Sequence, residues 1–162
     1  MSVVKLEGLV ALLEGFPALT GVDLAVSAGE IVFVKGPNGA GKTTLLHLCA
    51  GLIQPKEGKG QILGHDLSSE RTAIRKKVGL LSHSSGLYRD LTVLENITFW
   101  TQIAGVEKSE IDSRISWALE RMELDNKLQN QKARSLSVGQ KRRASLAVFI
   151  VRRPDLWLMD EP

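Results

Sequence analysis

The sequence predicts an α/β protein with a mostly parallel core sheet, antiparallel β-strands at the N-terminus and an all-helical insert. Three observations carry this prediction. The continuous apolar run 31–34 is typical of a strand that is buried on both faces of a sheet. A glycine-rich loop and a helical pattern follow this run directly, as in units that have parallel strands. From residue 92 onward, apolar residues recur at intervals of three and four, which indicates helices.

The composition indicates a globular protein. The 162 residues are 43% hydrophobic and 24% charged, which excludes a disordered chain. A net charge of +3 is too small to indicate a nucleic-acid partner by itself. No apolar run approaches the roughly 20 residues of a transmembrane helix. The single cysteine, Cys49, cannot form an internal disulfide, which fits a reducing compartment.

The remaining elements follow from local patterns. Val3–Leu6 and Val22–Val26 alternate like half-buried strands, and Ala28-Gly29 marks a turn. Leu156–Met159 is expected to be a buried strand, and Ser109 is expected to be the N-cap of its helix. In chain order, the expected helices cover Thr43–Leu52, Thr92–Ala104, Ser109–Leu124 and Ser137–Arg152.

Residues 36–43 match the phosphate-loop pattern G-x-x-x-x-G-K-[ST]. The loop consists of Gly36, Pro37, Asn38, Gly39, Ala40, Gly41, Lys42 and Thr43, and Thr44 follows it. Its glycines let backbone N–H groups point at phosphate oxygens, and the next helix adds its positive dipole end. We expect Lys42 to reach the β and γ phosphates and the Thr43 hydroxyl to ligate Mg²⁺. This loop alone does not distinguish a kinase, a GTPase or a transport ATPase.

Two carboxylates, Asp160 and Glu161, follow the expected strand Leu156–Met159. Ligands bind beyond the carboxyl ends of strands in open α/β sheets. Asp160 is therefore expected to hold Mg²⁺, and Glu161 is expected to act as general base on the attacking water. An acidic pair of this kind favours water as the nucleophile, so ATP hydrolysis moves ahead of phosphoryl transfer to a small acceptor.

A third motif lies between these two and consists of Leu136, Ser137, Val138, Gly139 and Gln140, followed by the basic run 141–143. With the phosphate loop and the segment LWLMDEP, it resembles the ATP-binding cassette (ABC) ATPases over essentially the whole chain. The resemblance implies a P-loop NTPase fold, ATP and Mg²⁺ as cofactors, and a head-to-tail dimer with a second ATPase subunit. It also implies that Ser137 and Gly139 bind the γ-phosphate held by the partner. Val138 stands where the commonest pattern has glycine.

His83 stands where most members of this family carry glutamine. With the segments 91–96 and 152–162, it resembles the ATP-binding subunit of the haem exporter of cytochrome c biogenesis. This resemblance implies integral membrane permease subunits as partners, a place at the cytoplasmic face of the plasma membrane and no nucleic-acid partner. His83 is then a further candidate catalytic residue that binds Mg²⁺ or its water. The family's adenine-stacking position falls on Leu13, and Phe16 is the nearby aromatic.

The same resemblance predicts a single ABC ATPase domain over 1–162, incomplete at its C-terminus, because this family has roughly 200 residues or more per domain. Residues 1–90 form its first half, 91–135 the helical insert and 136–162 the signature helix with the last strand. The truncated chain itself is not expected to complete turnover. Two alternatives stay open: the ATPase of another ABC exporter, and a soluble ABC ATPase that acts on nucleic acid or ribosomes.

Overall fold

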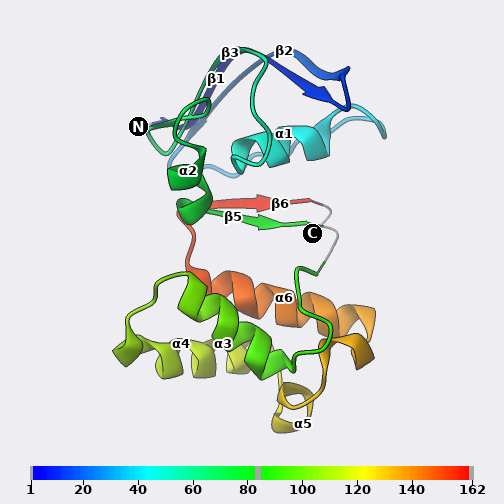
Figure 1. Ribbon diagram of the computed structural model, residues 1–162, viewed down its shortest axis with the longest axis vertical. Helices are drawn as coiled ribbons and strands as arrows, with labels where there is room; N and C mark the ends of the chain where they lie inside the picture. The colour runs from blue at the N-terminus through cyan, green and yellow to red at the C-terminus, as the bar shows by residue number, and fades with distance from the viewer. Residues whose placement is uncertain (1, 83–84, 161–162) are drawn as a thin grey trace. The chain divides into compact units, whose positions relative to one another are not determined.

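The computed structural model describes residues 2–82 and 85–160, which separate into two packed units (Figure 1). The first unit contains the chain up to Leu80 together with Asp155–Asp160, and the second contains Leu81–Pro154. Each unit has its own hydrophobic core. The elements that carry the phosphate loop therefore pack separately from those that carry the signature motif.

The first unit contains an antiparallel sheet with the strand order β2–β1–β3–β4. Its strands are β1 (Ser2–Leu13), β2 (Phe16–Ser27), β3 (Glu57–Ile62) and β4 (His65–Asp66). Glu14 and Gly15 join β1 to β2 with positive φ angles of 51° and 86°. Two positive φ angles are typical of a type I′ turn, whose twist matches that of a hairpin. The predicted antiparallel N-terminal strands are confirmed.

A second, two-stranded sheet in this unit pairs β5 (Val78–Leu81) with β6 (Leu156–Met159), and their arrows run in the same direction in Figure 1. The backbone N–H of Asp155 donates to the carbonyl of Lys77 at 2.8 Å, so the two strands enter the sheet together. Two helices, α1 (Lys42–Cys49) and α2 (Arg71–Lys77), complete the unit. The core includes Leu6, Leu9, Leu48, Ile62, Leu67 and Ile74, all fully buried.

The prediction of a buried strand at 31–34 is wrong. This run carries no strand, and Ile31 and Phe33 are 82% and 80% exposed. A strand exists only through its hydrogen-bonded neighbours, and β5 and β6 pair with each other instead. The expected strand Leu156–Met159 does form as β6, but only Leu158 in it is buried. An apolar run therefore indicates that its side chains favour burial, but it does not show that a neighbouring strand is available for pairing.

The second unit is helical, and its buried core includes Val93, Ile97, Ile115, Leu119 and Leu128. Its elements are α3 (Val93–Ile103), α4 (Lys108–Arg121), α5 (Asn126–Gln129), the 3₁₀ turn η1 (Ala133–Ser135) and α6 (Val138–Arg152). The predicted helices are confirmed in type. Helix α1 ends at Cys49, three residues before Leu52, because Gly51 adopts a positive φ of 69°. Ser109 is not an N-cap: α4 begins after Glu107, whose side chain makes no capping hydrogen bond.

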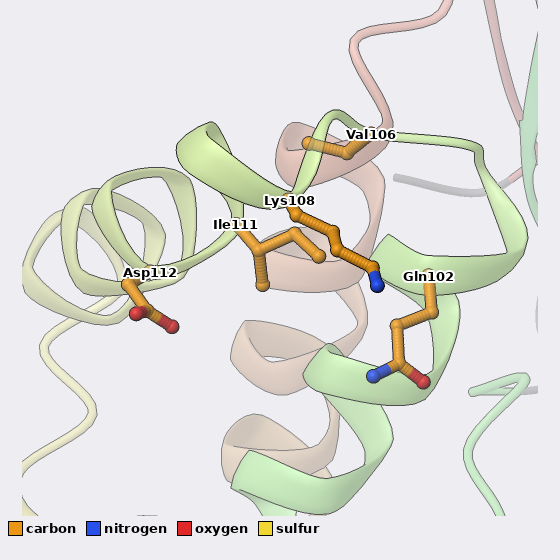
Figure 2. A pocket seen from close by; sticks show the side chains of 5 residues that line it. All are labelled: Gln102, Val106, Lys108, Ile111 and Asp112. Carbon is orange, nitrogen blue, oxygen red and sulfur yellow. The ribbon is translucent and has the colours of Figure 1, made fainter.

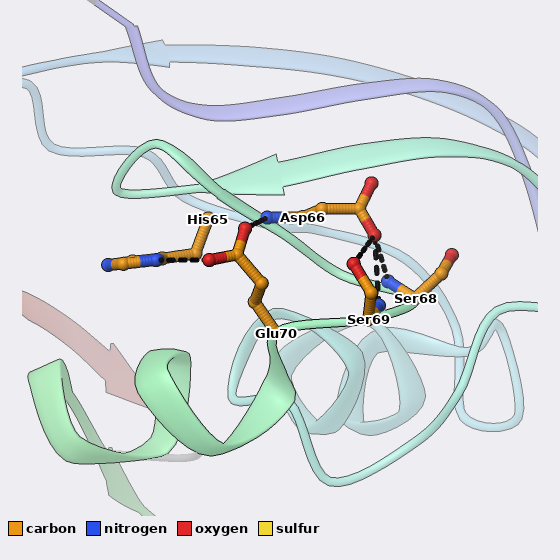
Figure 3. Close-up of polar contacts among 5 residues, drawn as sticks. All are labelled: His65, Asp66, Ser68, Ser69 and Glu70. Atoms are coloured by element: carbon orange, nitrogen blue, oxygen red, sulfur yellow. Dashed lines mark hydrogen bonds and ion pairs between the residues drawn. The ribbon is translucent and has the colours of Figure 1, made fainter.

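A compact set of polar contacts closes the turn between β4 and α2 (Figure 3). The Asp66 carboxylate accepts hydrogen bonds from the Ser69 hydroxyl at 2.8 Å and from the backbone N–H groups of Ser68 and Ser69 at 2.9 Å. The Glu70 carboxylate accepts from the backbone N–H of Asp66 and contacts the His65 ring. The hydrogen bonds from Ser69 and Ser68 lower the pKa of Asp66, and those from Asp66 and His65 lower the pKa of Glu70.

This turn should loosen at acid pH. Because the folded pKa of Asp66 lies below its usual value of 3.8, the contribution of its hydrogen bonds is present above pH 3.8 and is lost as pH falls through the folded pKa. In an NMR titration, the amide protons of Ser68 and Ser69 should shift with a midpoint below 3.8. Ser69→Ala should raise this midpoint. A wild-type midpoint at or above 3.8 contradicts the assignment.

Candidate nucleotide-binding site

The phosphate loop leads straight into α1, which begins without a side-chain cap. Gly41 is the N-cap residue, with φ of 85°, and no side chain bonds to the first turn. Residues 36–40 are exposed, and the N–H of Ala40 donates to the carbonyl of Pro37 at 3.2 Å, which folds the loop tightly. The amides of the first helical turn therefore stay open to an anion, which the helix dipole attracts.

Gly41 places the loop directly against β2. A Cβ atom at this position would lie 2.5 Å from the carbonyl oxygen of Ala18 and 2.9 Å from a methyl carbon of Leu19. Its backbone also has the left-handed conformation that side chains disfavour. Only glycine fits at position 41, because any side chain would collide with β2. This packing explains why the motif requires glycine here.

Lys42 is folded over its own loop. Its ammonium donates to the carbonyl oxygens of Gly36 and Pro37, both at 2.9 Å. No carboxylate among the described residues pairs with it. The positive charge is thus held at the loop by neutral acceptors, ready to bind phosphate oxygens.

Thr43 and Asp160 meet although 117 residues separate them in the sequence. The Thr43 hydroxyl donates to the Asp160 carboxylate at 2.8 Å. An alcohol and one carboxylate are ligands that Mg²⁺ accepts beside phosphate oxygens and water. The described residues contain no group of three or more His, Cys, Asp or Glu side chains that could hold a metal ion. Thr44, the next residue, is buried at 7% exposure.

Leu13 and Phe16, the two candidates for adenine contact, lie opposite each other at the end of the β1–β2 hairpin. They are 54% and 77% exposed. Ala18, two residues beyond Phe16, is the residue against which Gly41 packs. Both candidates therefore offer apolar surface at the end of the hairpin whose strand β2 adjoins the phosphate loop, as a base face requires.

The signature motif forms the start of α6. The Ser137 hydroxyl accepts from the N–H of Gln140 at 3.2 Å, and the Gln140 side chain accepts from the N–H of Ser137 at 2.8 Å. This capping box leaves the N–H groups of Val138 and Gly139 without a partner in the part of the chain that the structure describes. Val138 is 85% exposed, and a Cβ on Gly139 would meet nothing within 4 Å. Leu136, which is buried, anchors the motif.

Two predicted catalytic residues, His83 and Glu161, lie outside the described residues. Two described residues near position 83, Ser82 and Ser85, are bonded to α6. Arg142 donates to the carbonyl of Ser82 at 3.2 Å, and the Ser145 hydroxyl donates to the carbonyl of Ser85 at 2.6 Å. Sequence reasoning missed these contacts, because a basic residue after the signature motif reads as a solvated charge.

A separate hollow of about 400 Å³ lies at the turn between α3 and α4 (Figure 2). It is lined by Gln102, Val106, Lys108, Ile111 and Asp112. Figure 2 shows Lys108 extending toward Gln102. None of the predicted site residues lies there, so it does not belong to the nucleotide site.

Together, the phosphate loop, the uncapped start of α1 and the pairing of Thr43 with a strand-end aspartate define a P-loop nucleotide-binding protein. The sequence matches the family model of ABC transporters over residues 19–162. The chain therefore belongs to the ABC transporter family, and its fold is that of the family's ATP-binding cassette.

Known proteins support this assignment. The chain is 37% identical to a sulfate/thiosulfate import ATP-binding protein, CysA 1 of Agrobacterium fabrum, over 98% of its own length and 46% of the relative's. It is 36% identical to the cytochrome c biogenesis ATP-binding export protein CcmA of Cupriavidus pinatubonensis, over 91% and 64%. It superposes on the ATP-binding cassette MJ0796, a dimer in a post-hydrolysis state with ADP and Pi, with a TM-score of 0.86 at 30% identity. That match covers 98% of this chain and 74% of the solved one.

Two glycine substitutions in the loop should separate backbone strain from steric exclusion. Gly39 and Gly41 have similar φ angles of 81° and 85°, but a Cβ on Gly39 meets no atom within 4 Å. Gly39→Ala should cost about 1 kcal/mol of unfolding free energy. Gly41→Ala should cost about 2 kcal/mol more, because it adds the clash with Ala18. Urea denaturation measures both, and equal losses contradict the close approach.

Proposed function

We propose that this chain is the nucleotide-binding part of an ABC transporter that hydrolyses ATP to drive transport. The observation that carries the proposal is the hydrogen bond between Thr43 and Asp160. This hydrogen bond supports a metal site at the phosphate loop, to which the loop contributes Thr43 and the end of β6 contributes Asp160.

In this proposal, ATP lies with its phosphates over the loop and its adenine on Leu13 or Phe16. The open amides at the start of α1 bind phosphate oxygens, and the Lys42 ammonium exchanges its two loop carbonyls for the β and γ phosphates. Thr43 and Asp160 hold Mg²⁺, which neutralises phosphate charge when bound. Lys42 and Asp160 bond to neutral groups, and a charged ligand replaces these hydrogen bonds with stronger ones.

Glu161 is the proposed general base, which takes the proton of the attacking water. His83 is proposed to hold that water or the metal through a neutral ring nitrogen. Both roles rest on the sequence resemblance, with Glu161 adjoining the metal-binding Asp160.

A second ATPase subunit is the proposed partner in ATP binding, arranged head to tail. The N–H groups of Val138 and Gly139, which have no partner among the described residues, and the Ser137 hydroxyl lie exposed at the start of α6, where the helix dipole attracts an anion. We propose that this site binds the γ-phosphate held by the other subunit. The dimeric cassette MJ0796 is consistent with such an assembly.

Membrane permease subunits are the other proposed partners, which would place the protein at the cytoplasmic face of the plasma membrane. An aromatic cluster on the second unit supports this proposal. The rings of Tyr88 and Phe99 are 4.9 Å apart and those of Phe99 and Trp100 are 5.5 Å apart. Tyr88 is 49% exposed. The buried indole N–H of Trp100 has no acceptor among the described residues. In the described part of the chain, no helix is long and apolar enough to cross a bilayer.

Haem or a cytochrome-related molecule is the proposed cargo. His83 and the segments 91–96 and 152–162 support it, as does the CcmA relative, of which the chain covers more than it covers of CysA 1. Import is the second candidate, favoured by relatives such as PotA of Pseudomonas aeruginosa, a spermidine/putrescine import ATP-binding protein that is 39% identical. We further propose that 1–162 is one ABC ATPase domain.

Substitution of the proposed base should separate ATP binding from turnover. In the complete subunit that contains this chain, Glu161→Gln should keep ATP binding, trap the dimer and slow hydrolysis by about 10²–10⁴-fold. Lys42→Ala should lose ATP binding. Phosphate release and gel filtration with ATP measure the two effects, and the exposed Glu120→Gln is the matched control. Wild-type hydrolysis by Glu161→Gln means that the base is a different residue.

Substitution of the metal-binding carboxylate tests the observation that carries the proposal. Asp160→Asn keeps an oxygen that can accept from Thr43, but it removes the charge that attracts Mg²⁺. Titration calorimetry should show that Mg²⁺ no longer raises ATP affinity in this variant, whereas ATP with EDTA binds as in wild type. An undiminished effect of Mg²⁺ places the metal elsewhere.

A further inference from the structure

Asn96, on α3, is a fully buried amide with four backbone partners. Its side-chain oxygen accepts from the N–H of Tyr88 at 2.7 Å. Its nitrogen donates to the carbonyls of Tyr88, Leu91 and Thr92 at 3.1, 3.3 and 2.9 Å. Because a carbonyl only accepts and an N–H only donates, these partners fix the orientation of the amide. One side chain therefore closes both ends of the loop 88–92.

This loop is bonded in turn to a segment that is distant in sequence. We call residues 89–93 and 131–134 the strap. Three backbone hydrogen bonds hold the strap together: Arg134 N to Arg89 O at 3.0 Å, Ala133 N to Leu91 O at 2.9 Å, and Val93 N to Gln131 O at 3.0 Å. Thr92 and Lys132 form a β-bridge within it. The ion pair between Arg134 and Asp90 is exposed and adds little.

The strap runs directly into the signature motif. Beyond it, the N–H of Ser135 donates to Lys132 at 2.9 Å and the N–H of Leu136 donates to Ala133 at 3.4 Å. Leu136 is buried, and Ser137 then caps α6. The connection from residue 131 to Ser137 is thus short and bonded at each turn, so that a displacement of the strap moves the start of α6.

We infer that Asn96 is a positioning residue that holds Ser137 and Gly139 in a fixed relation to the loop 85–92. Without its amide, the carbonyls of Tyr88, Leu91 and Thr92 each lose one of their donors, and the side-chain hydrogen bonds that close the loop 88–92 are lost. The strap then loses the hydrogen bonds that Asn96 makes to the carbonyls of Leu91 and Thr92. The significance of this for catalysis rests on the proposed function, in which Ser137 and Gly139 bind phosphate.

Asn96→Asp tests the inference, because it keeps the shape of the side chain and removes its donors. Hydrogen exchange at neutral pH should show the amides of Val93, Ala133 and Arg134 exchanging at least about tenfold faster than in wild type, with β1 and β2 unchanged. The ratio of the exchange rate in Asn96→Asp to the rate in wild type should fall at acid pH, because the protonated carboxyl of Asp can donate a hydrogen bond again. The control is Asn130→Asp at an exposed side chain whose amide donates to the carbonyl of Asn126; it should leave the strap unchanged.

Each outcome decides the question. If the strap amides exchange no faster than in wild type, the inference is wrong. If Asn96→Asp loses protection from hydrogen exchange throughout 85–154, the Asn96→Ala variant, which buries no charge, decides the question. Faster exchange of its amides that is confined to the strap supports the inference. A loss of protection throughout 85–154 in this variant overturns it. In the complete subunit, nucleotide affinity should be kept while ATP-dependent dimerisation falls. If the strap amides exchange faster in Asn96→Asp but the wild-type subunit does not bind ATP, the inference about Asn96 stands and only the proposed function is refuted.

Discussion

The geometry of the phosphate loop depends on one close approach, that of residue 41 to β2. Because a Cβ here would lie 2.5 Å from a backbone oxygen of Ala18, the backbone can pass only where there is no side chain. The first turn of α1 begins at this point, and Lys42 and Thr43 are its first two residues. Their directions are therefore set by the same contact. From this first turn, the Thr43 hydroxyl bonds to the Asp160 carboxylate.

The two groups of ATP-binding residues that the family resemblance implies belong to separate packing units. The phosphate loop and Asp160 are supported by the core around Leu48 and Ile62, and the signature motif by the core around Val93 and Ile97. Within the second unit, the motif is positioned by its capping box and by the strap. Each motif is therefore held by the hydrogen bonds and the core of its own unit.

The features that the sequence predicted correctly are those whose partners are near in sequence. Ser137 and Gln140 are three residues apart, so the helix start could be predicted from residue types. The run 31–34 failed because a strand needs distant neighbours that composition does not reveal. Asn96 was missed for a different reason. Its partners are backbone groups of a loop, and a single asparagine in a helical pattern carries no sign of them.

The charged groups of the phosphate site are arranged for exchange of partners. Lys42 bonds to two neutral carbonyls, and Asp160 bonds to a neutral hydroxyl. Hydrogen bonds between an ion and a neutral group stabilise less than contacts between opposite charges at short range, so an incoming phosphate and its cation gain from replacing them. The backbone of Gly41 packs against β2 at the start of α1, directly before Lys42 and Thr43. The backbone offers N–H donors at the start of α1, and the side chains add the charge and the hydroxyl that strengthen phosphate binding.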